Sequence, residues 1–171
     1  MTLQILGGII ICTATTLLGL HLGGAGARRT KDLLEFKKTL ILLKSQINFA
    51  IYTLPQAFHH ISQRAAPPFD QFYTDLANEL ETGQMEAQAA WTTAVDKLKQ
   101  SSLSKEDLAN LQMLGASLGH MDAVVQINSI DMIITGIDDS LQQLLTQNPK
   151  NAKMYRGLGI VSGLLITIVL L

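Results

Sequence analysis

The sequence predicts an all-α protein: a helical bundle of about six helices, flanked by an N-terminal and a C-terminal transmembrane helix. Three observations lead to this fold class. Apolar residues recur three and four positions apart through the middle of the chain, which is the spacing of one face of an amphipathic helix. The four prolines fall between these periodic segments. Both ends are uncharged, with no Asp, Glu, Lys or Arg before Arg28 or after Arg156.

Residues 1–27 form the first predicted transmembrane helix. An apolar helix of this length covers the ~30 Å hydrocarbon core of a bilayer. A signal peptide is the alternative, because Ala25-Gly26-Ala27 resembles a cleavage motif. Signal peptides carry a basic region before the apolar core, however, and the residues up to Gln4 contain no basic side chain. We therefore favour an uncleaved helix.

Residues 154–171 form the second predicted transmembrane helix. The uncharged stretch from Gly157 to Leu171 would be roughly 22 Å long as a helix, which is short for a span. Lys153 and Arg156 can bury their aliphatic stems while their charges stay at the membrane interface, and Tyr155 suits the same depth. With these residues the segment becomes long enough to span.

The charges next to the two apolar ends predict the topology. Basic residues flank both segments on the side of the central domain, namely Arg28, Arg29, Lys31, Lys150, Lys153 and Arg156. Because basic flanking residues stay on the cytoplasmic side, we expect residues 28–153 to form a cytoplasmic domain of a cell-membrane protein.

Small residues recur four apart in both apolar ends. They are Thr15, Gly19 and Gly23 in the first and Gly159 and Gly163 in the second. Small faces let helices approach closely in lipid, so these residues are candidates for helix pairing within the chain or in a homo-oligomer. The other interpretation is that glycine is simply common in transmembrane helices. The sequence leaves both open.

The central domain is predicted to contain helices separated by proline and glycine. Their expected ranges are 28–52, 55–65, 69–81, 84–100, 104–118 and 121–148, and the first can continue directly from the apolar segment. Pro149 is expected to end the last helix, because proline disrupts helix interiors at ~3 kcal/mol or more. Ser104 and Asp107 resemble a capping box, and Thr82-Gly83 resembles a helix C-cap.

The apolar stripes of these helices predict the core. They contain Leu33, Phe36, Leu40, Leu43, Ile47, Trp91, Val95, Leu98, Leu108, Leu111, Leu114, Leu118, Ile127, Ile130, Ile134, Ile137, Leu141 and Leu144. The aromatic residues Phe49, Tyr52, Phe69, Phe72 and Tyr73 are interpreted as core rather than as a binding surface. Gly136 costs its helix ~1 kcal/mol relative to alanine, which a close helix crossing or simple tolerance would explain.

Charge is unevenly distributed along the central domain. Residues 28–44 hold six basic and two acidic side chains, whereas residues 70–139 hold twelve acidic and three basic ones. The basic segment suits an anionic cytoplasmic leaflet. The acidic segment could steer a basic protein partner, and Glu79, Glu81 and Glu86 are the candidate docking residues because they lie around one turn. The alternative is a solvated face kept soluble by like charge.

Motifs for catalysis and cofactor binding are missing from the sequence. The single cysteine, Cys12, excludes a disulfide framework and a multi-cysteine metal site. There is no phosphate-binding loop, zinc-protease motif, dinucleotide fingerprint or nucleophile elbow. His59 and His60 would point ~100° apart on a helix, and His120 lies near Asp122 at a helix junction. We therefore expect no enzyme activity, metal or cofactor, and treat an enzyme using these histidines as the weakest alternative.

The net charge of −1 gives no sign of nucleic-acid binding. We therefore expect the partners to be proteins and the lipid bilayer.

Three stretches of the chain resemble the stage III sporulation protein AB family. One runs from Gly115 to Gln126, a second from Gly83 to Val95 places Ala90-Trp91 after a glycine turn, and the third follows Lys153. The resemblance covers nearly the whole chain. One region departs from the family, which tends to show an acid and a tyrosine where this chain has Gln46 and Phe49.

The resemblance implies a function. Members of this family belong to a channel-like complex that joins mother cell and forespore in endospore-forming bacteria, and their soluble domain is similar to the cytoplasmic domain of type II secretion F platform proteins. This chain would then be a platform that couples a cytoplasmic ATPase, similar to stage III sporulation protein AA, to other membrane components of the complex. The alternative function is a membrane-tethered helical regulatory module that binds a signalling partner.

Overall fold

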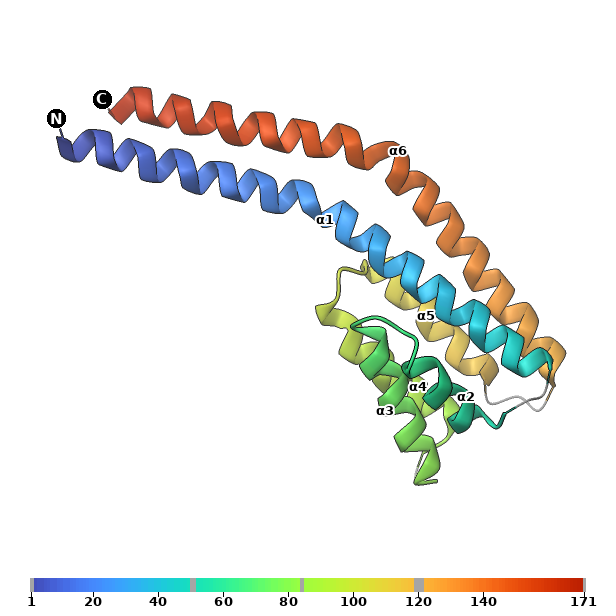
Figure 1. The fold of residues 1–171 in the computed structure, drawn as a ribbon. Helices are drawn as coiled ribbons and strands as arrows, with labels where there is room; N and C mark the ends of the chain where they lie inside the picture. The colour runs from blue at the N-terminus through green and yellow to red at the C-terminus, as the bar shows by residue number, and fades with distance from the viewer. Residues whose placement is uncertain (1, 50–51, 84, 119–121, 171) are drawn as a thin grey trace. The chain divides into compact units, whose positions relative to one another are not determined.

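The structure, a computed structural model, is helical throughout the part of the chain that it describes. It describes the backbone of residues 2–49, 52–83, 85–118 and 122–170, and most of the side chains from residue 24 to residue 146. The elements are α1 (Thr2–Asn48), α2 (Leu54–Ser62), α3 (Phe69–Glu81), α4 (Ala87–Lys97), the 3-10 helix η1 (Leu98–Gln100), α5 (Lys105–Leu118) and α6 (Ala123–Leu170) (Figure 1). These described segments contain no strand, so the all-α fold class is confirmed.

The chain separates into two compact units. The helical bundle comprises residues 31–141, and the terminal unit comprises residues 1–30 and 142–171. The terminal unit consists of the first part of α1 and the last part of α6, and both helices continue into the bundle without an intervening loop.

Across the residues that are described, no helix has both the length and the hydropathy needed to cross a bilayer.

Pro149 does not end the last helix, so that prediction was wrong. Helix α6 runs from Ala123 to Leu170 and includes Pro149. Proline removes one backbone donor and costs ~3 kcal/mol in a helix interior. A break at this residue would also remove backbone hydrogen bonds of the neighbouring turns, which the continuous helix keeps. The position of a proline in the sequence does not show which of these two free-energy costs is larger.

The other helix ends form largely as predicted. The Asp107 N–H donates to Ser104 Oγ at 3.1 Å and the Ser104 N–H donates to Asp107 Oδ2 at 2.8 Å, which confirms the capping box of α5. Gly83 has a φ of 64°, and its N–H donates to the carbonyl oxygen of Leu80 at 3.2 Å after α3 has ended. A left-handed residue at this position favours glycine. Helix α5 ends at Leu118, as the expected range 104–118 predicted.

The apolar stripes form the core of the bundle, as predicted for most of their members. Leu33, Phe36, Leu40 and Leu43 of α1 are all buried, and Ile130, Ile137 and Leu141 of α6 are buried as well. Ile133 is buried where the stripe indicated Ile134, which is half-buried. A shift of one residue turns the apolar face by ~100° about the axis, which is within the width of such a stripe.

A cluster of aromatic side chains joins four helices at the centre of the bundle. Its rings belong to Phe36, Phe58, Phe69, Phe72, Tyr73 and Trp91, and neighbouring ring centroids lie 4.9–6.3 Å apart. These are the separations at which tilted and edge-to-face ring pairs attract each other. Phe49 and Tyr52 do not join this core, contrary to prediction: they are 67% and 43% exposed near the end of α1. Helical spacing could not show that α1 ends at Asn48.

Trp91 fixes how closely α4 and α5 approach each other. Its indole is fully buried, and Nε1–H donates to the carbonyl oxygen of Leu111 at 2.7 Å. The face of α5 next to the indole has no side chain at Gly115, where an added Cβ would lie 2.8 Å from Trp91 Cδ1. A Cβ atom essentially never approaches a neighbouring atom so closely. Glycine is therefore required at residue 115 for this crossing.

Ion pairs between α1 and α6 revise the predicted charge segregation. Lys37 Nζ lies 2.6 Å from Asp138 Oδ1, and Lys44 Nζ lies 2.6 Å from Asp131 Oδ1. Two of the basic residues assigned to a membrane-facing segment are thus paired with acidic residues far away in sequence. The pairs are partly exposed, so each contributes ~0–1 kcal/mol and mainly sets the alignment of the two helices.

The packing of Trp91 predicts opposite effects of alanine at two glycines. Gly115→Ala should lower the free energy of unfolding by about 1–3 kcal/mol, because the added methyl group overpacks the contact with the indole. Gly136→Ala is the matched control, since nothing lies within 4 Å of its added Cβ, and it should stabilise α6 by up to ~1 kcal/mol. Thermal denaturation of the full chain, followed by circular dichroism, measures both; equal effects would contradict the contact described here.

Candidate functional site: an acidic turn between α3 and α4

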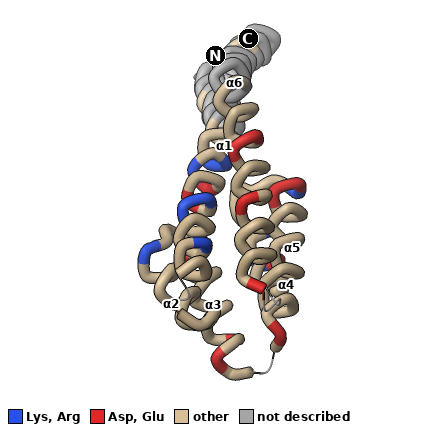
Figure 2. Tube along the Cα trace, turned by 90° about the vertical axis from the view of Figure 1, so that its right-hand side faces the viewer, with Lys and Arg blue, Asp and Glu red and all other residues tan. Residues whose placement is uncertain are grey.

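The turn between α3 and α4 carries two exposed carboxylates. Glu81 is the last residue of α3, and Glu86 is the residue before the first turn of α4. Both are exposed, and so is Met85, at 44%. Figure 2 shows acidic residues gathered where α3 ends and α4 begins. We call Glu81, Met85 and Glu86 the α3–α4 turn surface.

Glu79, the third predicted docking residue, points towards the bundle instead. Its side chain is 28% exposed, and Oε1 lies 3.7 Å from Lys97 Nζ. Lys97 also donates to Asp75 Oδ2 at 2.7 Å. Hydrogen bonding to Asp75 outweighs desolvation and raises the pKa of Lys97. Glu79 is thus part of a partly exposed ion-pair group with Asp75 and Lys97, and not of the exposed turn. Local spacing in the sequence gives no signal for this pairing, because Lys97 lies at the end of the next helix.

One carboxylate of the α3–α4 turn surface, Glu81, lies where a helix least favours negative charge, whereas Glu86 lies at the start of α4, where the helix dipole favours it. The last turn of α3 contains Glu79 and Glu81 and no basic residue. The carbonyl end of a helix carries a partial negative charge, so an acidic side chain there is unfavourable by ~0.3–1 kcal/mol. Glu79 is compensated by Lys97, but no ion pair within the described residues compensates Glu81. An unfavourable charge that no contact within the protein compensates indicates a functional surface.

A shallow depression adjoins this surface. It has a volume of about 630 Å³ and is lined by Glu86 and Gln88 of α4, Ala116 of α5, Gln126 of α6 and neighbouring residues. A carboxylate on the rim of such a depression can form an ion pair with a lysine or arginine of a partner. The aliphatic part of that side chain would then pack inside the depression.

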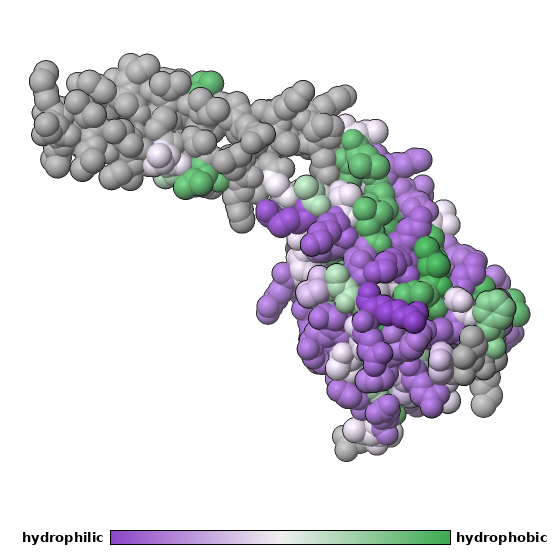
Figure 3. All heavy atoms as spheres, in the orientation of Figure 1, coloured by the Kyte–Doolittle hydropathy of each residue, from purple (hydrophilic) through white to green (hydrophobic). Residues whose placement is uncertain are grey.

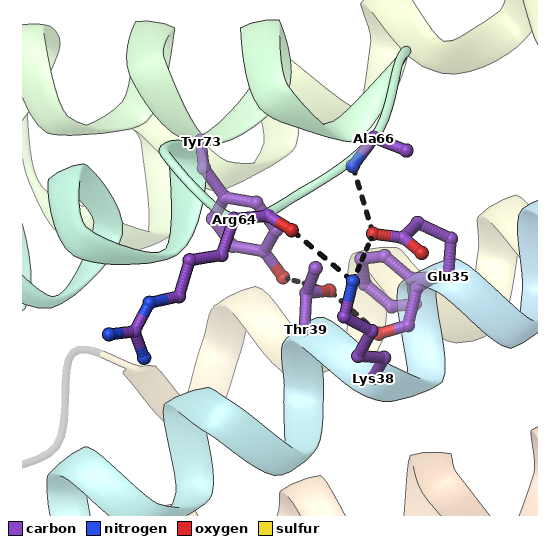
Figure 4. Close-up of polar contacts among 7 residues, drawn as sticks. Glu35, Lys38, Thr39, Arg64, Ala66 and Tyr73 are labelled. Atoms are coloured by element: carbon purple, nitrogen blue, oxygen red, sulfur yellow. Dashed lines mark hydrogen bonds and ion pairs between the residues drawn. The ribbon is translucent and has the colours of Figure 1, made fainter.

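Two contacts hold α2, α3 and their connection against α1 (Figure 4). The Ala66 N–H donates to Glu35 Oε1 at 2.8 Å, and Lys38 Nζ donates both to this oxygen at 3.1 Å and to the Arg64 carbonyl oxygen at 3.2 Å. The connection between α2 and α3 is therefore fastened at its backbone. This fastening sets where α3 starts, and so helps to position its acidic end.

The second contact lies inside the aromatic core. The Tyr73 hydroxyl lies 3.0 Å from Thr39 Oγ1, and Thr39 donates to the carbonyl oxygen of Phe36 at 2.7 Å. Burial raises the pKa of Tyr73 well above its ordinary value, so the hydroxyl remains neutral and hydrogen-bonded. Both contacts are structural and carry no reactive group.

The remaining candidate residues are only partly described. Arg28 and Lys31 are exposed and Arg29 is half-buried. The other predicted topology-setting and helix-packing side chains lie outside the described residues, and these are Lys150, Lys153, Arg156, Thr15, Gly19, Gly23, Gly159 and Gly163.

The described histidines make ordinary hydrogen bonds. His60 Nδ1 lies 2.9 Å from Gln46 Nε2, and His59 Nε2 lies 3.2 Å from Gln63 Nε2. Among the residues whose positions are given, no group of three His, Cys, Asp or Glu side chains is placed to hold a metal ion. His120 is outside this part of the chain.

Comparison with known proteins matches the whole chain. The family model for stage III sporulation protein AB matches residues 4–171. The chain belongs to the stage III sporulation protein AB family. A relative, stage III sporulation protein AB of Bacillus subtilis (strain 168), is 26% identical over 170 residues, which is 99% of each chain. The sequence resemblance is thus confirmed, and the protein belongs to a sporulation family.

A solved structure of stage III sporulation protein AB (SpoIIIAB) has a similar fold. It matches with a TM-score of 0.67 at 22% sequence identity, covering 71% of this chain and 96% of that one. Two stretches that carry the sequence resemblance to the family meet in the present structure. Trp91 comes from one and Gly115 from the other, and they form the tight contact between α4 and α5. In this chain, both residues therefore have a packing role.

The charge of Glu35 should make the stability of the bundle depend on pH. Burial raises the pKa of Glu35, but hydrogen bonds from Ala66 and Lys38 and the charges of Lys38 and Lys31 outweigh it and hold this pKa below its ordinary value of 4.5. A depressed carboxyl pKa stabilises the fold above the unfolded-state pKa, and this contribution is lost as pH falls through the folded-state pKa.

Glu35→Gln should therefore lower the free energy of unfolding by about 1 kcal/mol at pH 7, since the neutral amide keeps an acceptor but loses the charge. The difference from the unsubstituted protein should shrink as pH falls below 4.5. Urea denaturation at a series of pH values measures it. A difference that stays constant down to pH ~2.5 would show that the charge of Glu35 contributes nothing.

Proposed function

We propose that this protein is a membrane-anchored platform of a sporulation complex, on which a cytoplasmic secretion-type ATPase docks. The ATPase would be similar to stage III sporulation protein AA. The observation that carries the proposal is the α3–α4 turn surface. Two exposed carboxylates and an exposed methionine project from one turn, and one of the carboxylates, Glu81, lies at a helix end that disfavours negative charge. A basic partner would remove that local cost.

Membrane anchoring is supported by the sequence of the two ends. Residues 1–27 and 157–171 contain no charged side chain, and basic residues follow the first segment and precede the second. This pattern favours two spans with the bundle in the cytoplasm of the mother cell, where an ATPase has access to it.

The proposed role is mechanical. The bundle contributes no reactive constellation among its described residues, and its polar networks fasten helices to one another. Motion of a docked ATPase would pass through α3 and α4 to the rest of the bundle. Helices α1 and α6 continue from the bundle towards the apolar ends, and would carry this motion to other membrane components.

Reversing the charge of the α3–α4 turn surface should weaken ATPase binding. In Glu81→Lys/Glu86→Lys, the affinity for the purified ATPase should fall at least about tenfold, which is ~1.4 kcal/mol, because attraction becomes repulsion. Surface plasmon resonance with the immobilised full chain measures this. The variant should fold, since Glu81→Lys suits the helix dipole at the end of α3 and Glu86→Lys costs only ~0.3–1 kcal/mol at the exposed start of α4, and circular dichroism checks this.

The control has the same change in net charge on a different face of the bundle. Glu106→Lys/Asp139→Lys alters two exposed acidic residues of α5 and α6 and should leave ATPase binding within about twofold. If both double variants bind the ATPase as the unsubstituted protein does, docking does not use this turn. If the unsubstituted chain itself fails to bind, a membrane-tethered regulatory module becomes the better account.

The topology can be tested with a single introduced cysteine. Gln100 is exposed in η1, so Cys12→Ala/Gln100→Cys places one reactive thiol on the bundle. A membrane-impermeant maleimide should label this thiol only after the cells are permeabilised, because the bundle is expected in the cytoplasm. Labelling of intact cells would place the bundle outside and rule out contact with a cytoplasmic ATPase.

A further inference from the structure

An apolar groove lies between α5 and α6, away from the α3–α4 turn surface. Its volume is about 220 Å³, and Leu111 and Met113 of α5 and Met132, Ile133 and Gly136 of α6 are among its lining residues. Small-molecule sites usually have volumes of ~300–1,000 Å³. The smaller volume here suits one large apolar side chain better than a free ligand.

Gly136 has no packing role in the bundle that would explain it. An added Cβ would find nothing within 4 Å, so no neighbouring helix approaches at this point. Glycine in a helix interior nevertheless costs ~1 kcal/mol relative to alanine. A close crossing inside the bundle, one of the explanations that the sequence left open, is thus excluded. The open space above Gly136 faces the groove, where another chain could approach the backbone of α6.

Two exposed methionines border the groove. Met113 is 65% exposed and Met132 is 68% exposed, and each lines the same cavity from its own helix. Unbranched, polarisable methionine side chains adapt their shape to an inserted apolar group, as they do at surfaces that bind amphipathic helices.

Acidic residues lie one heptad from each methionine. Glu106 precedes Met113 by seven residues on α5, and Asp139 follows Met132 by seven on α6, so each shares a helix face with its methionine. Both carboxylates are exposed, and within the described part of the chain neither has an ion-pair partner. Lys105 is the basic residue beside Glu106, but it points ~100° away around α5.

We propose that this groove binds a basic amphipathic helix of another protein. One large apolar side chain of that helix would enter the space above Gly136 between Met113 and Met132. Lysine or arginine about seven residues away, ~10.5 Å along the helix, would meet Glu106 and Asp139. The site is separate from the α3–α4 turn surface and does not require the ATPase to be the partner.

A second copy of the chain fits the groove less well than a basic partner does. Within the bundle, Lys37, Lys44 and Lys97 already pair with carboxylates of their own chain. These three lysines are therefore not available to a second copy of the chain, whose net charge of −1 also gives less attraction to the two carboxylates than a basic helix gives.

The test uses a synthetic probe and the full chain in nonionic detergent micelles. The probe is a fluorescein-labelled helical peptide with one leucine-rich stripe and lysines one heptad from its central leucine, and a matched peptide has glutamate in place of lysine. Fluorescence anisotropy, corrected for binding to empty micelles, should show binding of the basic peptide and at least about tenfold weaker binding of the acidic one.

Variants of Gly136 separate the groove from general charge attraction. Gly136→Leu fills the groove and should weaken binding of the basic peptide at least about tenfold, whereas Gly136→Ala should leave it within about threefold. Glu106→Lys/Asp139→Lys should weaken it about tenfold, and Glu81→Lys/Glu86→Lys should leave it unchanged. Circular dichroism checks that Gly136→Leu is folded.

Two results would overturn the proposal. If Gly136→Leu binds the basic peptide as tightly as the unsubstituted chain does, the groove is not the site. If sedimentation velocity shows that Gly136→Leu dissociates an oligomer, the occupant is a second copy and not a basic partner. Neither result bears on ATPase docking, which is measured separately with the variants of Glu81 and Glu86.

Discussion

The burial of Trp91 is the constraint on which the bundle depends. Its indole lies against Phe58 and Phe72, and its Nε1–H is satisfied by the carbonyl oxygen of Leu111. A buried indole without a partner for this N–H would lose a hydrogen bond worth ~1 kcal/mol or more. Gly115 must therefore keep α5 close enough for its backbone to reach the ring. Once α4 and α5 are set at this distance, the other aromatic rings settle the places of α2 and α3.

Some charged side chains form ion pairs within the bundle, and others are exposed on its surface. Lys37, Lys44 and Lys97 pair with carboxylates of other segments, so much of the basic charge stabilises or aligns the bundle. Basic residues gather on the side of α1, while acidic residues extend over α4, α5 and the end of α3 (Figure 2). An apolar band also runs between the charged side chains on the face shown in Figure 3. Exposed carboxylates lie beside apolar side chains at the α3–α4 turn surface and near the groove between α5 and α6. A surface that combines negative charge with apolar side chains suits a basic protein partner.

Local sequence signals predicted most helix ends. Features that depend on contacts between helices could not be predicted from them. The capping pair Ser104 and Asp107 and the left-handed Gly83 act within one turn, so sequence suffices for them. The inward turn of Glu79 needs Lys97 from the next helix, and the continuation of α6 past Pro149 needs the balance of a whole segment's hydrogen bonds. The sequence showed a glycine inside a helix at residue 136 but gave no reason for it. The groove beside Gly136 could not be predicted, because no sequence pattern indicates an unfilled space next to a helix.

The two ion pairs between α1 and α6 favour one register of these helices. Lys37 and Lys44 are seven residues apart, and so are their partners Asp138 and Asp131 on a helix that runs the other way. A slip of one turn, ~5.4 Å, separates both pairs. A slip of two turns in either direction brings one lysine opposite the other's carboxylate and restores a single pair. The spacing of these four residues therefore favours the observed register over a slip of one or two turns, because only the observed register forms both pairs.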